Sequence, residues 1–147
     1  MDEHDFGDVI HLIRKEDSRY ERRAYFFLRD ALDHTVGAMR KAEAKSGKKR
    51  ESNHVTGQEL LEGIRDYALA QYGPMAHLVL SSWGIRRCGD FGEMVYQLIE
   101  HGVFSKPEAD RKEDFSELFE FEDVFVKPFQ PKRRRLPAPP LANSEVS

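Results

Sequence analysis

Helix start and stop signals follow one another so closely between residues 54 and 95 that this block permits little except a compact helical core. A capping box opens it, in which the hydroxyl of Thr56 is followed three positions later by Glu59. Gly73 supplies a left-handed stop, and Pro74 is preorganised for the first turn of the next helix, which Gly84 ends. The block therefore predicts three helices, at about 57–72, from Pro74 to Gly84, and at about 91–101.

Apolar residues at helical spacing predict two further helices before this block. One is short and carries Phe6 and Ile13, and the other runs over about 19–42. Further starts are predicted where a short polar residue precedes an acid by three positions. These capping residues are Asp5, Ser18, Asp90 and Asp114. The aromatic residues on the apolar stripes, namely Tyr67, Tyr72 and Trp83, are expected in the core.

The fold class is thus mainly α, a single compact domain of about five helices over residues 1–126. Residues 119–126 roughly alternate apolar and acidic side chains, which is typical of a strand but also fits a bent helix end. A small C-terminal β element, and with it a winged-helix-like order, is therefore left open. Residues 40–50 hold six bases and one acid and are expected to form an exposed loop that frays the preceding helix.

Length and composition place the chain among globular proteins. Its 147 residues suit one domain, with 39% hydrophobic and 11% aromatic residues. No apolar run approaches the length of a membrane span, and no secretory signal is expected. Cys88 is the only cysteine, which excludes an internal disulfide and suits a reducing cytoplasm.

Charge is unevenly distributed along the chain. Residues 127–147 contain five of the 23 bases and one of the 26 acids, so residues 1–126 hold 18 bases and 25 acids and carry a net charge of −7. Five of the seven prolines also lie in residues 127–147, which are expected to form a disordered basic tail. An acidic body with a basic tail is not typical of a general nucleic-acid binder.

The order of motifs resembles the Minf family, a group of bacterial proteins of unknown function. The likeness covers roughly residues 8–126 and rests on His54–Arg65, Gly73–Ile85 and Asp90–Val95, together with the aromatic residues near Tyr25. The resemblance implies a bacterial cytosolic protein and supports the helical fold. It implies no activity, cofactor or catalytic residue.

Three kinds of chemistry are weighed against simpler interpretations. Asp90-Phe91-Gly92 has the letters of a kinase motif, but no glycine-rich or catalytic loop accompanies it, and a helix start explains it. Asp30 and His34 share a helix face and would hold a metal only with further ligands, which no spacing marks. Cys88 follows two arginines that would favour a thiolate.

A winged-helix order would make the helix at about 91–101 a DNA-recognition helix. Its exposed residues would include Glu93 and Glu100, and carboxylates repel the phosphates that a groove reader must approach. Specific DNA binding is therefore not expected, and an acidic surface of this kind is better suited to a protein partner.

These patterns favour a non-catalytic protein-binding module without a cofactor. The residues expected at the partner interface are the exposed bases Arg86, Arg87, Lys132, Arg133, Arg134 and Arg135. Two alternatives stay open. One is an RNA- or ribosome-associated factor that uses residues 40–50 and the tail, and the other is an enzyme with a polar pocket near His54 and Cys88.

Overall fold

Five α-helices, with short helical turns after α3 and near the C-terminal end, form the described part of the chain in this computed structural model. The structure describes residues 3–48, 55–105, 112–115 and 118–131. The helices are α1 (Glu3–Glu16), α2 (Arg22–Ser46), α3 (Gly57–Tyr72), α4 (Ala76–Ser82) and α5 (Cys88–Glu100). The shorter turns are η1 (Gly73–Met75), η2 (Lys112–Phe115), η3 (Glu122–Val126) and η4 (Lys127–Phe129). The mainly helical fold class is confirmed.

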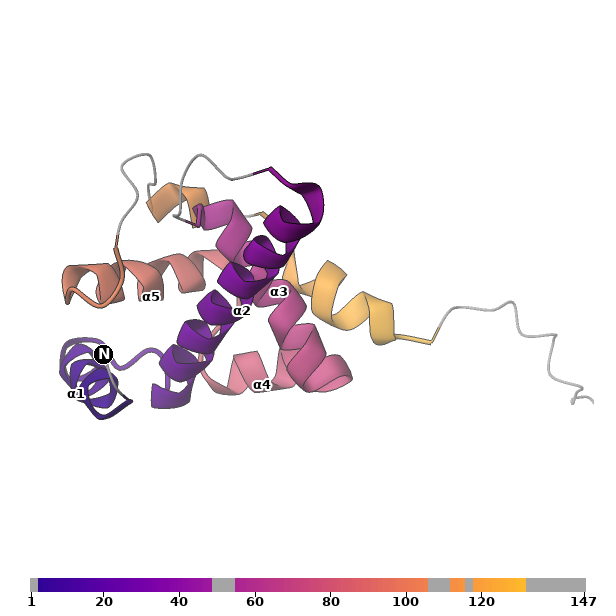
Figure 1. The fold of residues 1–147 in the computed structure, drawn as a ribbon. Helices are drawn as coiled ribbons and strands as arrows, with labels where there is room; N and C mark the ends of the chain where they lie inside the picture. Colours follow the sequence, from indigo (N-terminus) through magenta and orange to yellow (C-terminus); the bar gives the residue numbers. More distant parts are fainter. Residues whose placement is uncertain (1–2, 49–54, 106–111, 116–117, 132–147) are drawn as a thin grey trace, which may run out of the picture.

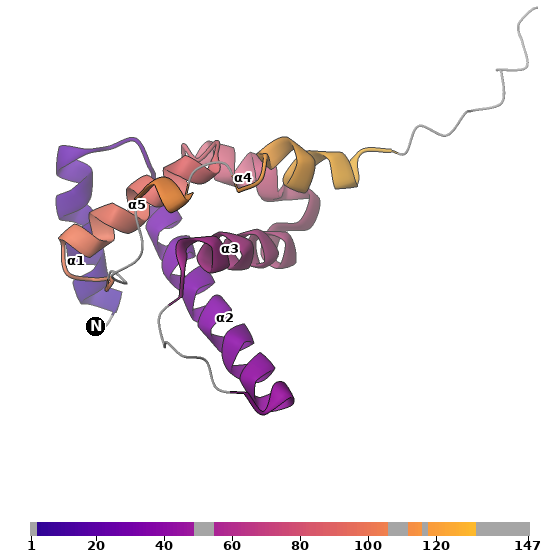
Figure 2. The ribbon, with the colours of Figure 1, turned by 90° about the horizontal axis from the view of Figure 1, so that it is seen from above.

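The long helix α2 organises the body. Figures 1 and 2 show it crossing α3, with α1 beside its first turns and its last turns extending past the other helices. The crossing is close at Gly63, where a side chain would collide with Thr35 of α2. Thr35 is itself buried and donates its hydroxyl hydrogen bond to the Ala31 carbonyl at 2.7 Å. Gly63 is thus the residue that lets the two helix backbones approach.

The buried core draws on α1, α2, α3, α4 and α5 and on the C-terminal turns. Its largest fully buried side chains include Phe6, Tyr20, Tyr25, Leu61, Ile64, Leu80, Phe91 and Phe125. Burial of this kind stabilises by about 25 cal/mol for each Å² of apolar surface removed from water. Tyr67, Tyr72 and Trp83 pack against this core but stay partly exposed, so the expectation that they are core residues was wrong.

The helix starts are only partly as predicted. The capping box of Thr56 and Glu59 is confirmed, with Thr56 Oγ1 accepting from the Glu59 N–H at 3.1 Å. Asp5 lies inside α1, which begins at Glu3, and Ser18 precedes α2 by several residues. Both predictions were wrong. The stabilisation from one capping side chain is small, and the burial of apolar residues between packed helices outweighs it.

Asp90 is not the N-cap residue that the sequence predicted, because Arg87 holds that position and Asp90 is the acid of the capping box. It is the third residue of α5, and its carboxylate reaches back to accept from the Arg86 and Arg87 N–H groups at 2.8 and 3.2 Å. The fifth predicted cap, Asp114, falls within η2, and its partner position 117 lies outside the described residues.

Two segments differ from a sequence prediction or decide between two predictions, namely residues 40–50 and residues 119–126. Helix α2 runs on to Ser46, so residues 40–46 of the predicted basic loop are helical, while residues 49–50 lie outside the described part. The alternating segment forms the wide helical turn η3, with Phe121 and Phe125 buried four positions apart. Within the described residues there is no strand, so the winged-helix alternative lacks its β wing.

Candidate functional site

The predicted interface residues do not gather into one described site. Arg86 and Arg87 are exposed in the turn before α5. Their backbone N–H groups, not their side chains, make the contacts to Asp90. Residues 132–135, the basic cluster of the tail, lie outside the described residues.

Cys88 is placed as a structural residue. It is 1% exposed, and its thiol donates a hydrogen bond to the Phe119 carbonyl at 3.3 Å. A thiol that is buried and engaged in this way is closed to a substrate. His54, the other residue of the predicted polar pocket, lies outside the described residues.

The possible metal pair is also explained by packing. His34 is exposed, and its ring lies against Tyr67 with centroids 5.3 Å apart. The nearby Asp30 carboxylate lies 3.4 Å from the guanidinium of Arg29. In the described part of the chain, no three side chains of the metal-binding types come together as a ligand set. None of the helices there is both long and apolar enough to cross a membrane.

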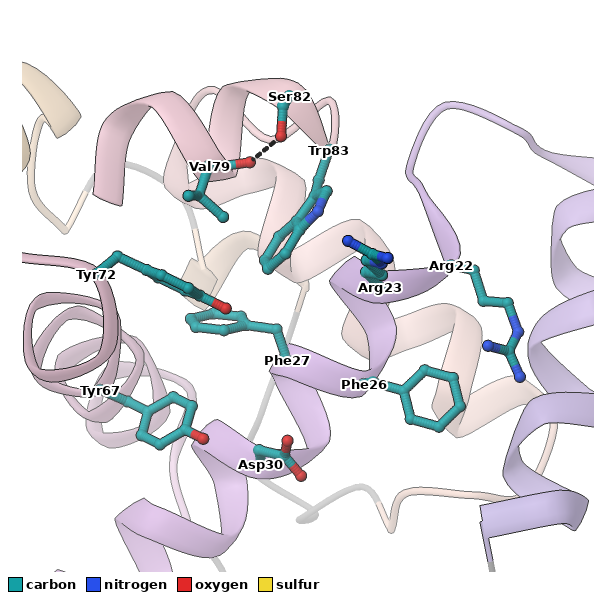
Figure 3. A pocket seen from close by; sticks show the side chains of 10 residues that line it. All are labelled: Arg22, Arg23, Phe26, Phe27, Asp30, Tyr67, Tyr72, Val79, Ser82 and Trp83. Atoms are coloured by element: carbon teal, nitrogen blue, oxygen red, sulfur yellow. Dashed lines mark hydrogen bonds between the residues drawn. The ribbon is translucent and has the colours of Figure 1, made fainter. Parts of the chain in front are cut away.

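A groove that the sequence did not predict lies where the start of α2, the end of α3 and the end of α4 meet (Figure 3). We call it the aromatic groove. It has a volume of about 690 Å³ and is lined by Arg22, Arg23, Phe26, Phe27, Asp30, Tyr67, Tyr72, Val79, Ser82 and Trp83. A second hollow of about 350 Å³ shares Arg22, Arg23, Ser82 and Trp83 and continues toward Arg14 of α1.

Phe27 forms the floor of the aromatic groove. The residue is 4% exposed, and its ring lies between three other rings, with centroids 5.5 Å from Tyr67, 6.1 Å from Tyr72 and 5.5 Å from Trp83. The planes of Tyr72 and Trp83 are 80° apart at a centroid distance of 6.0 Å. Because these rings are tilted, they present edges and creases instead of one flat stacking face.

Two arginines stand at one end of the aromatic groove. Arg22 and Arg23 occupy the first turn of α2, and both are exposed. The Arg22 guanidinium lies over the Phe26 ring at 4.7 Å from its centroid. Among the described residues, no carboxylate forms an ion pair with either arginine, and the helix dipole disfavours cations at this position. This end of the groove therefore carries uncompensated positive charge.

Unused hydrogen-bond donors line the other walls. The Tyr67 and Tyr72 hydroxyls and the Trp83 indole N–H make no hydrogen bond within the described part of the chain. Burial, followed by the negative charge of Asp30, raises the pKa of both tyrosine hydroxyls, so they stay protonated and able to donate at neutral pH. The Ser82 hydroxyl is already engaged, because it donates to the Val79 carbonyl at 2.6 Å.

Two sequence signals point to this groove in retrospect. Tyr25, Phe26 and Phe27 are consecutive in α2, and successive helix positions point about 100° apart. They cannot all face the core, so at least one must line another surface. Arg22 and Arg23 at the positive end of a long helix are a second signal.

Comparison with protein-family models, with curated proteins and with solved structures found no match for this chain. The geometry of the aromatic groove is therefore the feature that indicates a function.

Proposed function

We propose that this protein is a cytoplasmic, non-catalytic protein-binding module that holds a segment of its partner in the aromatic groove. The observation that carries the proposal is the combination of partly exposed aromatic rings with two arginines that have no ion-pair partner among the described residues. Tyr, Trp and Arg are the residue types most enriched at the energetic centre of protein interfaces. The bases Arg86, Arg87 and those of residues 132–135 serve as accessory contacts.

The proposal also accounts for the sign of the charges. Residues 1–126 carry a net charge of −7, so the positive end of the aromatic groove is a local exception on an acidic body. A carboxylate of the partner would be drawn to Arg22 and Arg23 and repelled by most of the remaining surface. The partner segment is therefore acidic.

An RNA-binding role fits this groove less well. A single strand needs a continuous basic track for its phosphates and flat aromatic faces for its bases. The aromatic groove offers two arginines that have no ion-pair partner in the described part of the chain, the carboxylate of Asp30 and tilted rings. RNA binding through residues 40–50 and the tail is the alternative, and the test must distinguish it from protein binding in the aromatic groove.

The test compares three forms of the full chain bearing an affinity tag. These are the wild type, the double variant Arg22→Glu/Arg23→Glu, and the control Arg40→Glu, which reverses an exposed charge on the same helix within the basic segment 40–50. Circular dichroism first establishes that all three fold. The proteins and the nucleic acid that each tagged form retains from a cell extract are quantified. A protein that only the double variant fails to retain is then purified and titrated against all three forms.

We expect a partner that the wild type and Arg40→Glu bind equally and that the double variant binds at least about tenfold more weakly. Loss of an ion-paired contact in an interface centre is of this size. Equal retention of every protein by all three forms would refute the proposal. Nucleic acid that is lost with Arg40→Glu but kept by the double variant would replace it with the RNA alternative.

A further inference from the structure

Hydrogen-bond donors outnumber acceptors in the aromatic groove, and this imbalance restricts what it binds. The donors without a partner in the described part of the chain are the Tyr67 and Tyr72 hydroxyls, the Trp83 indole N–H and the guanidinium groups of Arg22 and Arg23. Among the described residues that line the groove, Asp30 alone carries a carboxylate. A complementary ligand must therefore offer many acceptors and few donors.

We infer that the aromatic groove binds a proline-rich partner segment in the polyproline II conformation, with an acidic residue beside the prolines. This inference rests on the proposed protein-binding function and names the class of ligand. A polyproline II segment makes no internal hydrogen bonds, so its carbonyl groups are free to accept, and each proline lacks an N–H donor.

Other peptide conformations fit the groove less well. In an α-helical ligand the carbonyl groups are already bonded within the helix, so the tyrosine and tryptophan donors would remain unused. An extended strand needs the free edge of a sheet, and the described residues contain no strand. Aromatic-lined surfaces with creases between the rings are the usual receptors of polyproline II segments.

The dimensions of the groove agree with a short segment. Arg23 and Asp30 are seven positions apart on α2, which corresponds to about 10 Å of helix axis at 1.5 Å per residue. Three to four residues of polyproline II cover the same length at about 3.1 Å each. Tyr67 and Tyr72 stand at the end of the groove opposite the two arginines (Figure 3). The prolines therefore lie over the rings, and the acidic residue lies beside Arg22 and Arg23.

Trp83 makes this inference directly measurable, because it is the only tryptophan in the chain and it lines the groove. The full chain is titrated with the capped peptide Pro-Pro-Ala-Pro-Pro-Asp-Glu while tryptophan emission is followed. One control peptide replaces every proline by Gly or Ser, and a second replaces both acids by Lys. The protein variants are Arg23→Glu, Tyr72→Phe and, as a matched control, Arg40→Glu.

We expect a saturable change in emission with the first peptide and at least tenfold weaker binding of both control peptides. Arg23→Glu should weaken binding about tenfold or more, Tyr72→Phe by about two- to tenfold for one lost hydrogen bond, and Arg40→Glu not at all. Equal binding of the proline-free peptide, or no saturable change, would overturn the inference. If groove variants still lose their cellular partner in that case, the protein-binding proposal stands without its proline specificity.

The chain has a proline-rich segment of its own, with Pro137, Pro139 and Pro140. A variant of the full chain with these three prolines changed to Ser tests whether that segment occupies the groove. We expect unchanged emission and unchanged peptide affinity. An emission shift without peptide, together with tighter peptide binding, would assign the groove to the tail of this chain and overturn the assignment to a partner.

Discussion

The Tyr20 hydroxyl donates a hydrogen bond of 2.7 Å to the Asp90 carboxylate, joining residues that are 70 positions apart in the chain. The second oxygen of Asp90 accepts from the N–H groups of Arg86 and Arg87. Tyr20 is 1% exposed and Asp90 is 9% exposed. One buried carboxylate therefore ties the segment between α1 and α2 to the start of α5.

Replacing Asp90 should destabilise the fold strongly. Asp90→Ala leaves the Tyr20 hydroxyl and two N–H groups without their acceptor, and we expect a loss of about 2–4 kcal/mol in the free energy of unfolding. Tyr20→Phe removes only one of these hydrogen bonds and should cost about 1 kcal/mol. Urea denaturation measures both values. Equal losses for the two variants would show that the N–H contacts contribute nothing.

Stability should fall as the pH rises above about 10. Burial, and then the hydrogen bond to Asp90, raises the pKa of Tyr20 well above its usual range, and burial raises that of Tyr25 likewise. The unfolded chain releases these protons near pH 10 while the folded protein keeps them, so unfolding releases protons and is favoured by alkali. Their full contribution is present below pH 10 and is lost as the pH rises through the folded pKa values.

The slope of the unfolding free energy against pH should differ between the wild type and Tyr20→Phe. In the wild type each such tyrosine contributes up to about 1.4 kcal/mol per pH unit, and Tyr20→Phe should reduce the slope by that amount. Unfolding free energies from urea titrations between pH 9 and 11 give the slopes. The same slope in both proteins would mean that Tyr20 ionises equally in the folded and unfolded states.

Gly84 should tolerate no side chain, whereas Gly37 should accept one. Gly84 has a φ of 90°, and a Cβ there would collide with the backbone carbonyl oxygen of Arg19. We expect Gly84→Ala to cost about 1–3 kcal/mol or more. Gly37 lies in α2 with open space around it, so Gly37→Ala should stabilise by about 0.5–1 kcal/mol. Thermal unfolding of both variants checks the opposite signs, and a neutral Gly84→Ala would contradict the close approach.

Arg23→Glu should stabilise the protein even though it removes ligand binding. The change puts a carboxylate at the positive end of α2, where Arg23 has no ion-pair partner among the described residues. Exchanging an unfavourable charge for a favourable one at this position is worth about 0.5–1.5 kcal/mol. Arg40→Glu, in the interior of the same helix, should show no such gain in urea denaturation. A stability loss specific to Arg23→Glu would indicate that Arg23 supports the fold and not a ligand.

Duplex DNA should bind weakly and without sequence preference. Residues 132–135 hold the densest positive charge of the chain, and such charge binds phosphates by counterion release. The affinity for DNA, measured by fluorescence anisotropy, should fall steeply as the salt concentration rises from about 50 to about 200 mM. It should largely vanish when Lys132, Arg133, Arg134 and Arg135 are replaced by alanine. Sequence-selective binding that survives this replacement at physiological salt would argue for a DNA-binding regulator.

Local patterns in the sequence predicted the helices because each signal acts within a few residues. The helix over 57–72 was predicted at its observed bounds, since Thr56, Glu59 and Gly73 fix its ends by bonds between near neighbours. The same local logic placed a helix start at Asp90, which is instead the third residue of α5. Its carboxylate also accepts from the Tyr20 hydroxyl, 70 positions away, and a cap signal cannot register a contact at that distance.

The aromatic groove was decided by the tertiary structure. The sequence by itself determined that the chain forms amphipathic helices, because hydrophobic spacing and caps are properties of adjacent residues. It did not determine which apolar residues stay partly exposed. Tyr67, Tyr72 and Trp83 lie on apolar stripes like the core residues, but the way in which α2, α3 and α4 meet leaves one side of each ring uncovered. The angle and closeness of those helices follow from contacts such as Gly63 against Thr35, which exist only once the chain has packed.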